Sequence, residues 1–281
     1  MTMTLGLVFA VLCAIAKAAD TLVNKRVMRD TPVVEHIFWR IIFVTPILFL
    51  ASAFNWHFES GALWYLFGYG ALEAVNIAAH QFAVKRTDPL SVEIVSKSKV
   101  IFVLIVSCVL MVDRLSLASS VGIAVFMAGA VMSINYKAKR EKGEGKGGIA
   151  LELVSVLART FKPFMLKQCI RDGLASNESM AALSMVVAFV LLFAVYRPRL
   201  APSSVSVGAY SAQAVIVGAS MLLSGWAVIL SNTVIVNAIE GTSAIFVMAF
   251  CAIAQKKKYP ALTVAGCIVA VVGIVMSALL T

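Results

Sequence analysis

Stretches of mostly apolar residues alternate with short polar connectors along the whole chain. Each stretch approaches the ~20 residues that a membrane-spanning helix needs, although the seventh is short and the eighth and ninth are poorly separated near Asn232. Lipid offers no partner for open backbone groups, so runs of this length must be helices. We predict an all-α integral membrane protein with ten transmembrane helices: Leu5–Val27, Val33–Ala53, Gly61–Val84, Leu90–Val112, Leu117–Tyr136, Gly148–Ile170, Met180–Val195, Val207–Leu230, Val234–Ala254 and Ala261–Leu280.

One pair of neighbouring stretches occurs twice. Ile101–Ser133 and Ile245–Ser277 lie 144 positions apart and align without a gap. Both open with Ile-Phe-Val and close with Val-Met-Ser, and their glycines match at Gly122/Gly266 and Gly129/Gly273. The match predicts an internal duplication. The alternative is a chance similarity between two hydrophobic helix pairs rich in Ala, Val, Ile and Gly.

Composition agrees with a membrane protein, since 61% of residues are hydrophobic, 14% are charged and the mean hydropathy is +0.94. The first stretch has no basic n-region and carries Lys17 and Asp20 within its apolar run. We interpret it as a retained helix and not as a signal peptide. All five cysteines fall in predicted spans and form no CxxC pair, so we expect no disulfide framework, metal cluster or cofactor.

The net charge of +10 comes from Lys and Arg residues that are sorted by connector. Even connectors hold almost none, and the odd connectors hold Lys25, Arg26, Arg29, Lys85, Arg86, Lys137, Lys139, Arg140, Lys142, Lys146, Arg197, Arg199, Lys256, Lys257 and Lys258. Under the positive-inside rule the odd connectors face the cytoplasm and both termini lie outside. This location argues for the lipid bilayer as a partner, and against nucleic acid. We expect the cytoplasmic (inner) membrane of a bacterium.

The fifth connector, Lys137–Gly147, is the long polar run of the chain and divides it into halves. We predict a first five-helix repeat at residues 1–137, a basic cytoplasmic linker at 138–147 and a second repeat at 148–281. An odd number of spans in each half makes the second repeat enter from the opposite face, so the repeats are inverted about an axis in the membrane plane. This architecture is typical of secondary transporters, whose site lies near the midplane between the repeats.

The two halves resemble the EamA-like branch of the drug/metabolite transporter superfamily. The resemblance is carried by VLMVDRLSLASSVGIAVFMAGAVMS and its echo AIAQKKKYPALTVAGCIVAVVGIVMS. The family's turn reads glycine–glutamate–arginine–leucine–serine, and here Val112–Asp113–Arg114–Leu115–Ser116 keeps the acid, the arginine and Leu-Ser. The second copy has Lys257 in place of the acid, and the proline common early in helices four and nine is absent. The resemblance implies a ten-helix metabolite carrier of unspecified substrate.

Charged residues inside the predicted spans carry the candidate chemistry. They are Lys17, Asp20, Arg40, Glu73, Glu93, Lys97, Lys99, Glu152, Arg159, Lys162 and Glu240, with His80 and Gln81. A charge at the bilayer centre costs about 2.5–3.5 kcal/mol on insertion scales, so these groups must face one another or water. Six are cations and five are anions, which favours an anionic or zwitterionic substrate.

Two of the cations occupy related places in the two halves. Lys17 and Arg159 lie 142 positions apart, each near the middle of its span. We predict that they form a clamp for a carboxylate or phosphate, for which a guanidinium offers two parallel donors. The alternative is a structural pair, for example Lys17 with Asp20 one turn away.

The fourth span is the most polar. Glu93 and Lys97 share a helix face by their i,i+4 spacing, and Lys99 points elsewhere. The second copy has Asn237, Gly241 and Ser243 at the matching positions. Such divergence is expected of a site for one asymmetric ligand. The alternative is that Lys97 extends to the cytoplasmic interface.

The remaining candidates have two readings each. Arg40 is a substrate contact or an anchor at a helix mouth, and Lys162 and Lys99 join the predicted substrate-binding set. The proton-coupling candidates are Glu73, Glu93, Glu240 and His80. Alternatively, Glu73 neutralises Lys97 or Arg159, and His80 is a hydrogen-bonded core residue.

An aromatic residue and a proline complete the predicted site. We expect Trp226 to line the pocket, although most aromatic residues in such chains are interface anchors. Pro163 is expected to break the sixth span and to free backbone carbonyls for a substrate, unless it is a tolerated kink.

We therefore predict a secondary active transporter that moves a small polar anionic or zwitterionic metabolite by alternating access. The driving force is the substrate's own gradient, exchange or protons, and the assembly is a monomer or a homodimer. A flippase for a phosphorylated lipid-linked intermediate and a non-transport assembly protein are the alternatives. An enzyme is not expected, because HExxH and GxSxG motifs are absent, and no GxxxxGK[ST] loop indicates ATP hydrolysis.

Overall fold

The computed structural model describes residues 2–28, 31–87, 92, 95–110, 117–134, 146–198, 200, 206–255 and 260–279. Within these ranges the chain is helical and has no strand, and Phe58 and Ala175 form an isolated β-bridge between two loops. Three predicted features lie outside the described residues: Glu93, the turn at Val112–Ser116, and most of the basic linker.

The helices follow the predicted spans closely. The described elements are α1 (Thr2–Val27), α2 (Val33–Ser52), η1 (Ser60–Ala62), α3 (Leu63–Arg86), α5 (Lys99–Leu110), α6 (Leu117–Ile134), α7 (Lys146–Arg171), α8 (Asn177–Tyr196), α9 (Val207–Leu230), α10 (Thr233–Glu240), α11 (Ser243–Gln255) and α12 (Ala261–Leu279). The seventh span, predicted short, has 20 residues as α8. The indistinct boundary near Asn232 is resolved, since its side chain caps α10 by accepting from the Val234 and Ile235 amides.

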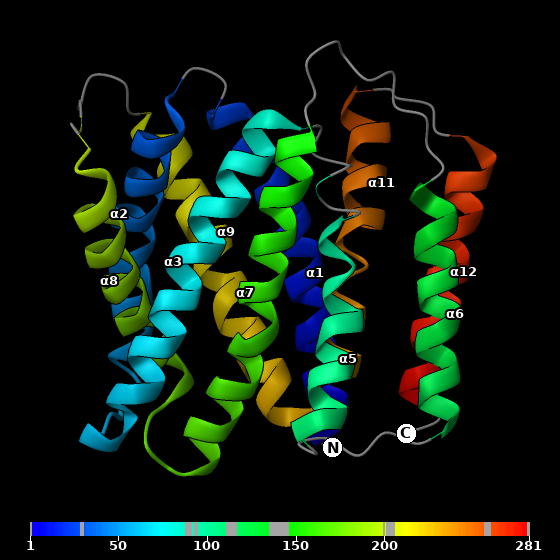
Figure 1. Cartoon of the computed structure of the whole chain (residues 1–281), viewed down its shortest axis with the longest axis horizontal. Helices are drawn as coiled ribbons and strands as arrows, with labels where there is room; N and C mark the ends of the chain where they lie inside the picture. Colours follow the sequence, from blue (N-terminus) through cyan, green and yellow to red (C-terminus); the bar gives the residue numbers. More distant parts are fainter. Residues whose placement is uncertain are drawn as a thin grey trace.

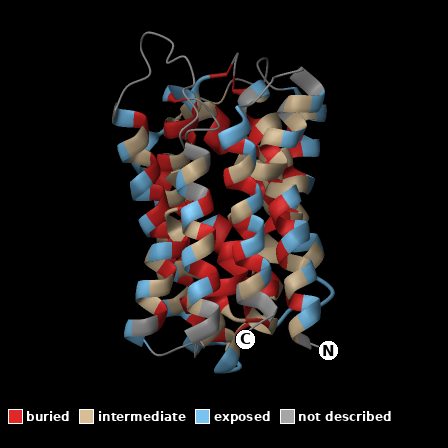
Figure 2. Cartoon of the chain, turned by 90° about the vertical axis from the view of Figure 1, so that its right-hand side faces the viewer, coloured by how far each residue is buried: buried red, intermediate tan, exposed pale blue. Residues whose placement is uncertain are grey.

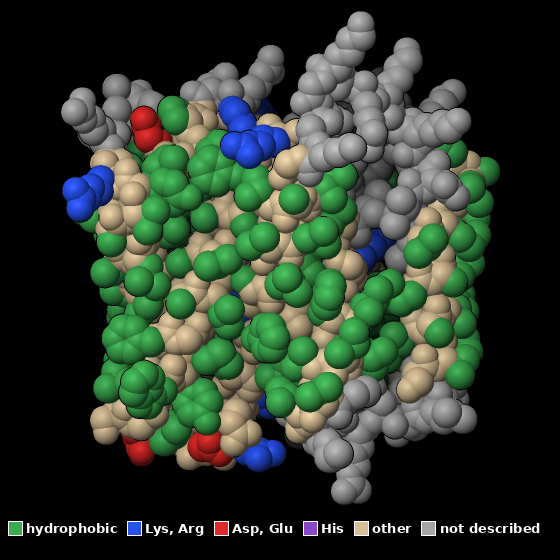
Figure 3. All heavy atoms as spheres, in the orientation of Figure 1, with side chains coloured by type: hydrophobic (Ala, Val, Ile, Leu, Met, Phe, Trp, Pro, Cys, Tyr) green, Lys and Arg blue, Asp and Glu red, His purple; other side chains and the backbone are tan. Residues whose placement is uncertain are grey.

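The exterior suits a lipid environment. Five described helical segments are long and apolar enough to cross a membrane: Met3–Asn24, Val33–Ser52, Asn177–Tyr196, Val207–Leu230 and Thr233–Phe250. On the face shown in Figure 3, hydrophobic side chains cover the middle, and most of the visible charged side chains gather at the two ends. Exposed residues lie on the outward faces of the helices and buried residues point inward (Figure 2). The chain is a multi-pass integral membrane protein.

Helices α6 and α12 pack as a pair at one edge of the molecule (Figure 1). A Cβ atom added to Gly129 would collide with the backbone of Gly266 and Ala270. One added to Gly273 would collide with the backbone of Gly122 and Phe126. The contact is reciprocal, because each partner residue lies 144 positions from its counterpart. Reciprocal contacts of this kind are what a two-fold relation produces.

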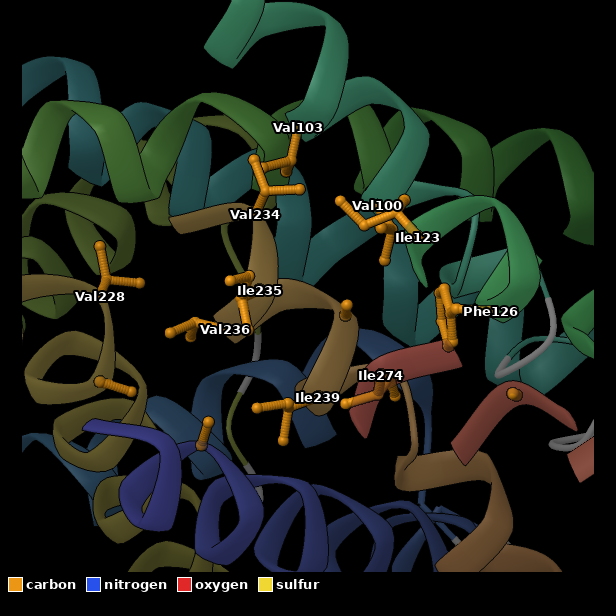
Figure 4. Packing of buried hydrophobic residues seen from close by; sticks show 14 of the residues in the cluster. Val100, Val103, Ile123, Phe126, Val228, Val234, Ile235, Val236, Ile239 and Ile274 are labelled. Carbon is orange, nitrogen blue, oxygen red and sulfur yellow. The ribbon is translucent and has the colours of Figure 1, made fainter. Parts of the chain in front are cut away.

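Helix α10 lies at the centre of the largest buried cluster. All of its residues from Thr233 to Glu240 are buried. Its apolar side chains pack against Val100 and Val103 of α5, Phe126 of α6 and Val228 of α9 (Figure 4). A second cluster joins α2, α3, α8 and α9. Because lipid is as apolar as these side chains, close packing rather than exclusion from water holds them together.

The fourth and ninth spans were predicted as continuous helices, and this prediction is wrong. The amide of Ser98 donates to the carbonyl of Val95 (3.0 Å), so a tight turn at Lys97 and Ser98 precedes α5. The amide of Thr242 donates to the carbonyl of Ile239 (2.9 Å), and this turn separates α10 from α11. The two turns lie 144 positions apart. Irregular backbone at membrane depth is tolerated where it is buried in protein or lines a cavity.

Candidate functional site

Both turns line one cavity of about 190 Å³ inside the helix bundle. Its walls come from α1, α2, α3, α5, α7, α8, α9, α10 and the start of α11. Among the described residues, its charged lining comprises six cations, Lys17, Arg40, Lys97, Lys99, Arg159 and Lys162, and three carboxylates, Asp20, Glu73 and Glu240. His80 also lines it.

Glu240 sits between two lysines. It is the last residue of α10, is 5% exposed and accepts a 2.6 Å hydrogen bond from Lys17 Nζ on its Oε2 atom. Lys99 Nζ lies 3.9 Å from the same oxygen. On Oε1, the carboxylate accepts from the hydroxyl of Ser224, and the thiol of Cys13 lies 3.5 Å away. One carboxylate therefore holds two ammonium groups from two other helices.

A second ion pair joins α3 to α7. Lys162 Nζ donates to Glu73 Oε2, and the side-chain amide of Asn76 is 3.4 Å from Glu73 Oε1. The Lys162 ammonium also lies 4.7 Å from the ring centre of Tyr69, which suits a cation–π contact. Glu73 was expected to neutralise Lys97 or Arg159 if it were structural, and its partner is Lys162 instead.

The third cluster surrounds Glu152, which is completely buried. Arg159 donates to Glu152 Oε1 from two turns further along α7, and His80 Nδ1 lies 2.8 Å from Glu152 Oε2. Lys17 and Arg159, predicted as a clamp, thus both line the cavity, and each is engaged by a glutamate. The alternative pairing of Lys17 with Asp20 is wrong, because Lys17 pairs with Glu240.

Asp20 pairs with Arg40 through two parallel hydrogen bonds, of 3.2 and 2.6 Å. Gln213 donates to Asp20 (3.1 Å) and to Asn24 (3.1 Å), which extends the cluster to α9. From Asn24 the network continues to Gln81 (2.8 Å) and His36 (2.6 Å). Polar side chains of α1, α2, α3 and α9 are therefore connected on one side of the cavity. Each buried polar group gains a partner that lipid would not supply.

The structure brings most of the predicted site residues together. Those that line the cavity are Lys17, Arg40, Lys97, Lys99, Arg159, Lys162, Glu73, Glu240 and His80. Glu93 lies outside the described residues. Lys97 is 4% exposed, so the expectation that it extends to the interface is not met.

Trp226 does not belong to the described lining, contrary to our expectation. Its indole nitrogen donates to Glu178 Oε1 (2.9 Å), which directs the ring away toward the start of α8. The aromatic residue of the described lining is Tyr69. Its position one turn before Glu73 on α3 is a signal that sequence reasoning could have used.

Helix α7 continues through Pro163, so the predicted break in the sixth span is wrong. Proline still lacks the amide that would bond back to the fourth preceding residue, and Pro163 lines the cavity. In the part of the chain that the structure describes, no group of three His, Cys, Asp or Glu residues could hold a metal ion.

Part of the chain is similar to a known protein family. Residues 4–135 match the model of the EamA-like transporter family. This range lies within the first predicted repeat, although the division into two repeats stays a prediction. The members of this family are transporters rather than enzymes.

The fold of this chain has been seen before. A solved structure described only as "Crystal structure of protein" is 15% identical and superposes with a TM-score of 0.74. The alignment covers 100% of this chain and 99% of that one, so the whole chain shares one fold with it. No curated protein matches the chain.

Proposed function

We propose that this chain is an EamA-like transporter and acts as a secondary active carrier of a small polar metabolite that is anionic or zwitterionic. The observation that carries the proposal is the charge of the cavity, where six cations and three carboxylates form the charged part of the described lining. Adding the buried Glu152, which pairs with Arg159, still leaves more cations than anions. An intramembrane excess of positive charge is costly unless an anion or water offsets it.

The size of the cavity supports a small substrate. About 190 Å³ lies below the roughly 300–1,000 Å³ of sites for drug-sized ligands. Two arginines in the lining, Arg40 and Arg159, offer the planar donor geometry that suits a carboxylate or phosphate. A site for lipophilic cations would instead need an unpaired acid among aromatic rings.

The placement of the cavity supports alternating access. It lies where the fourth and ninth spans are interrupted at positions 144 residues apart, and inverted-repeat carriers use such discontinuous helices at their midplane sites. The reciprocal α6–α12 contact is consistent with the same two-fold relation. We infer that two five-helix repeats rock about this cavity, with the odd connectors in the cytoplasm of a bacterial cell.

A thermal-shift screen tests the substrate class. Purified protein in detergent is heated with amino acids, organic anions, phosphorylated metabolites, nucleotide sugars, an isoprenyl phosphate and organic cations. A ligand at about 100 times its Kd stabilises the native state by about 2.7 kcal/mol. We expect one anionic or zwitterionic class to raise the melting temperature, and Arg159→Gln and Lys97→Gln to weaken this response at least tenfold in apparent affinity.

The matched control is Arg171→Gln, which removes an exposed arginine at the end of the same helix, α7, outside the cavity. It should respond as the wild type does. Stabilisation by organic cations alone, or unchanged responses in both cavity variants, would contradict the proposal. Stabilisation by the isoprenyl phosphate alone would favour a flippase.

A further inference from the structure

Glu240 occupies the place where an anion would find its best partners in the cavity. Its Oε2 atom is 2.6 Å from Lys17 Nζ and 3.9 Å from Lys99 Nζ. These ammonium groups come from α1 and α5, and their side chains keep 34% and 16% exposure, so a ligand in the cavity can reach both. The other lining carboxylates, Asp20 and Glu73, each form an ion pair with one cation.

The two lysines stabilise the negative charge of Glu240 at a place in the helix that disfavours it. It ends α10, where the helix dipole is negative and disfavours a carboxylate. Lys17, Lys99 and the Ser224 hydroxyl offset this cost. An incoming carboxylate or sulfate-like group that engages both lysines would deprive Glu240 of its charge partners.

A displaced Glu240 would have few alternatives. It is 5% exposed, and the titratable groups near it include Cys13 of α1, Tyr69 of α3 and Lys162 of α7. Arg159 of α7 lies near Lys17, and Lys97 also lines the cavity. Arg159 and Lys162 already pair with Glu152 and Glu73. The described parts of α6 and α12, which also contact α10, carry no charged residue. A buried carboxylate without a partner takes up a proton rather than remain ionised.

We propose that the transported anion and Glu240 compete for Lys17 and Lys99, so that Glu240 takes up one proton when the anion binds. The inference rests on the proposed function and adds its coupling: the carrier moves a proton together with its anion. The proton comes from solution and bonds to a Glu240 carboxylate oxygen, and it leaves when the anion is released and the Lys17–Glu240 pair forms again. No other bond changes.

Because anion binding is linked to proton uptake, the affinity for the anion must depend on pH. Binding is measured with L-lactate, L-glutamate and sulfate, whose charges are constant between about pH 6 and 8. For a probe that binds, the apparent Kd of the wild type should rise up to tenfold per pH unit across this range. Binding in a weakly buffered solution should take up close to one proton per anion.

Glu240→Gln removes both the competitor and the proton. It should bind the same probe at least tenfold more tightly than the wild type near pH 8, with a smaller dependence on pH and less proton uptake than the wild type. The matched control is Glu178→Gln, because Glu178 is also buried but lies outside the cavity lining, held by Asn55 and Trp226. It should retain the pH dependence of the wild type.

Each outcome bears on a definite claim. Anion binding without proton uptake by the wild type, a measurement that needs no variant, would overturn the coupling and leave the proposed function intact. The coupling is also overturned if Glu240→Gln keeps the wild-type pH dependence. If no probe binds to the wild type or to Glu240→Gln, the anion site and the proposed function both fall.

Discussion

At the scale of single residues, this protein handles intramembrane charge by pairing it across helices. Glu73 and Lys162 bind each other between α3 and α7, and Glu240 bridges α1 and α5. Each ion would be expensive to bury alone, so removing one partner is worse than removing both. The pairs therefore fix which helix faces meet.

The Lys162–Glu73 pair gives a direct test of this principle. Lys162→Met should destabilise the protein by about 3–5 kcal/mol, because it strands a buried carboxylate. The double variant Lys162→Met/Glu73→Gln should recover much of this loss. Unfolding in detergent, followed by circular dichroism, measures both. Equal losses in the single and double variants would contradict the claim that the stranded Glu73 carboxylate causes the loss.

Trp226 provides a contrasting case, since its indole donates to Glu178 and not to the cavity. Trp226→Phe keeps the ring and removes the donor. We expect a loss of about 1–3 kcal/mol in stability, the cost of leaving a buried acceptor less satisfied. Affinity for the ligand found in the thermal-shift screen should be unchanged. A tenfold loss of affinity would mean that Trp226 belongs to the binding site.

At the scale of elements, glycines decide how closely the α6–α12 pair can pack. Helix association in lipid depends on close backbone approach, which small residues permit. Gly129 and Gly273 each face the backbone of the opposite helix, with no space for a Cβ atom. Two short turns at related positions likewise let α5 and α11 begin at the cavity.

The glycine contact predicts a paired effect. Gly129→Ala and Gly273→Ala should each destabilise the protein by about 1–3 kcal/mol, because overpacking forces backbone shifts. The effects should be similar, since the two contacts are reciprocal. Gly208→Ala on α9 is the control, because a Cβ atom there meets nothing within 4 Å. Thermal unfolding in detergent checks all three, and unaltered stability of both variants would contradict the close approach.

At the scale of the whole molecule, α2 ends and α7 begins at opposite ends of the bundle (Figure 1). The positive-inside rule assigns the connector after α2 to the outside and the linker before α7 to the cytoplasm. Phe54 is 87% exposed, and Gly147 is also exposed, so both sites can report on sidedness.

Thiol labelling tests this orientation. In a background without the five native cysteines, Phe54→Cys should react with a membrane-impermeant maleimide in intact cells. Gly147→Cys should react only after the cells are permeabilised. The two sites exchange behaviour if the orientation is inverted, so the measurement decides between the two topologies, and labelling of both sites in intact cells would contradict either.

The amino-acid sequence by itself determined where the helices lie and which residues carry buried charge. Span length and polar connectors are local properties, which is why Val207–Leu230 was predicted with its observed bounds. The 144-residue repeat likewise marked Gly129 and Gly273 before any contact was known. The high cost of a lone charge in lipid made the gathering of Lys17, Glu73 and Glu240 in one interior space foreseeable.

Only the tertiary structure decided the partners. Lys17 pairs with Glu240, 223 residues away, instead of Asp20 on its own helix, and Asp20 pairs with Arg40. The turns at Lys97 and Gly241 were also not predicted, because each lies inside a run long enough to be interpreted as one continuous span. A side chain's partner depends on the rotation and approach of neighbouring helices. Those are set by packing over the whole bundle, which the periodicity of one helix does not contain.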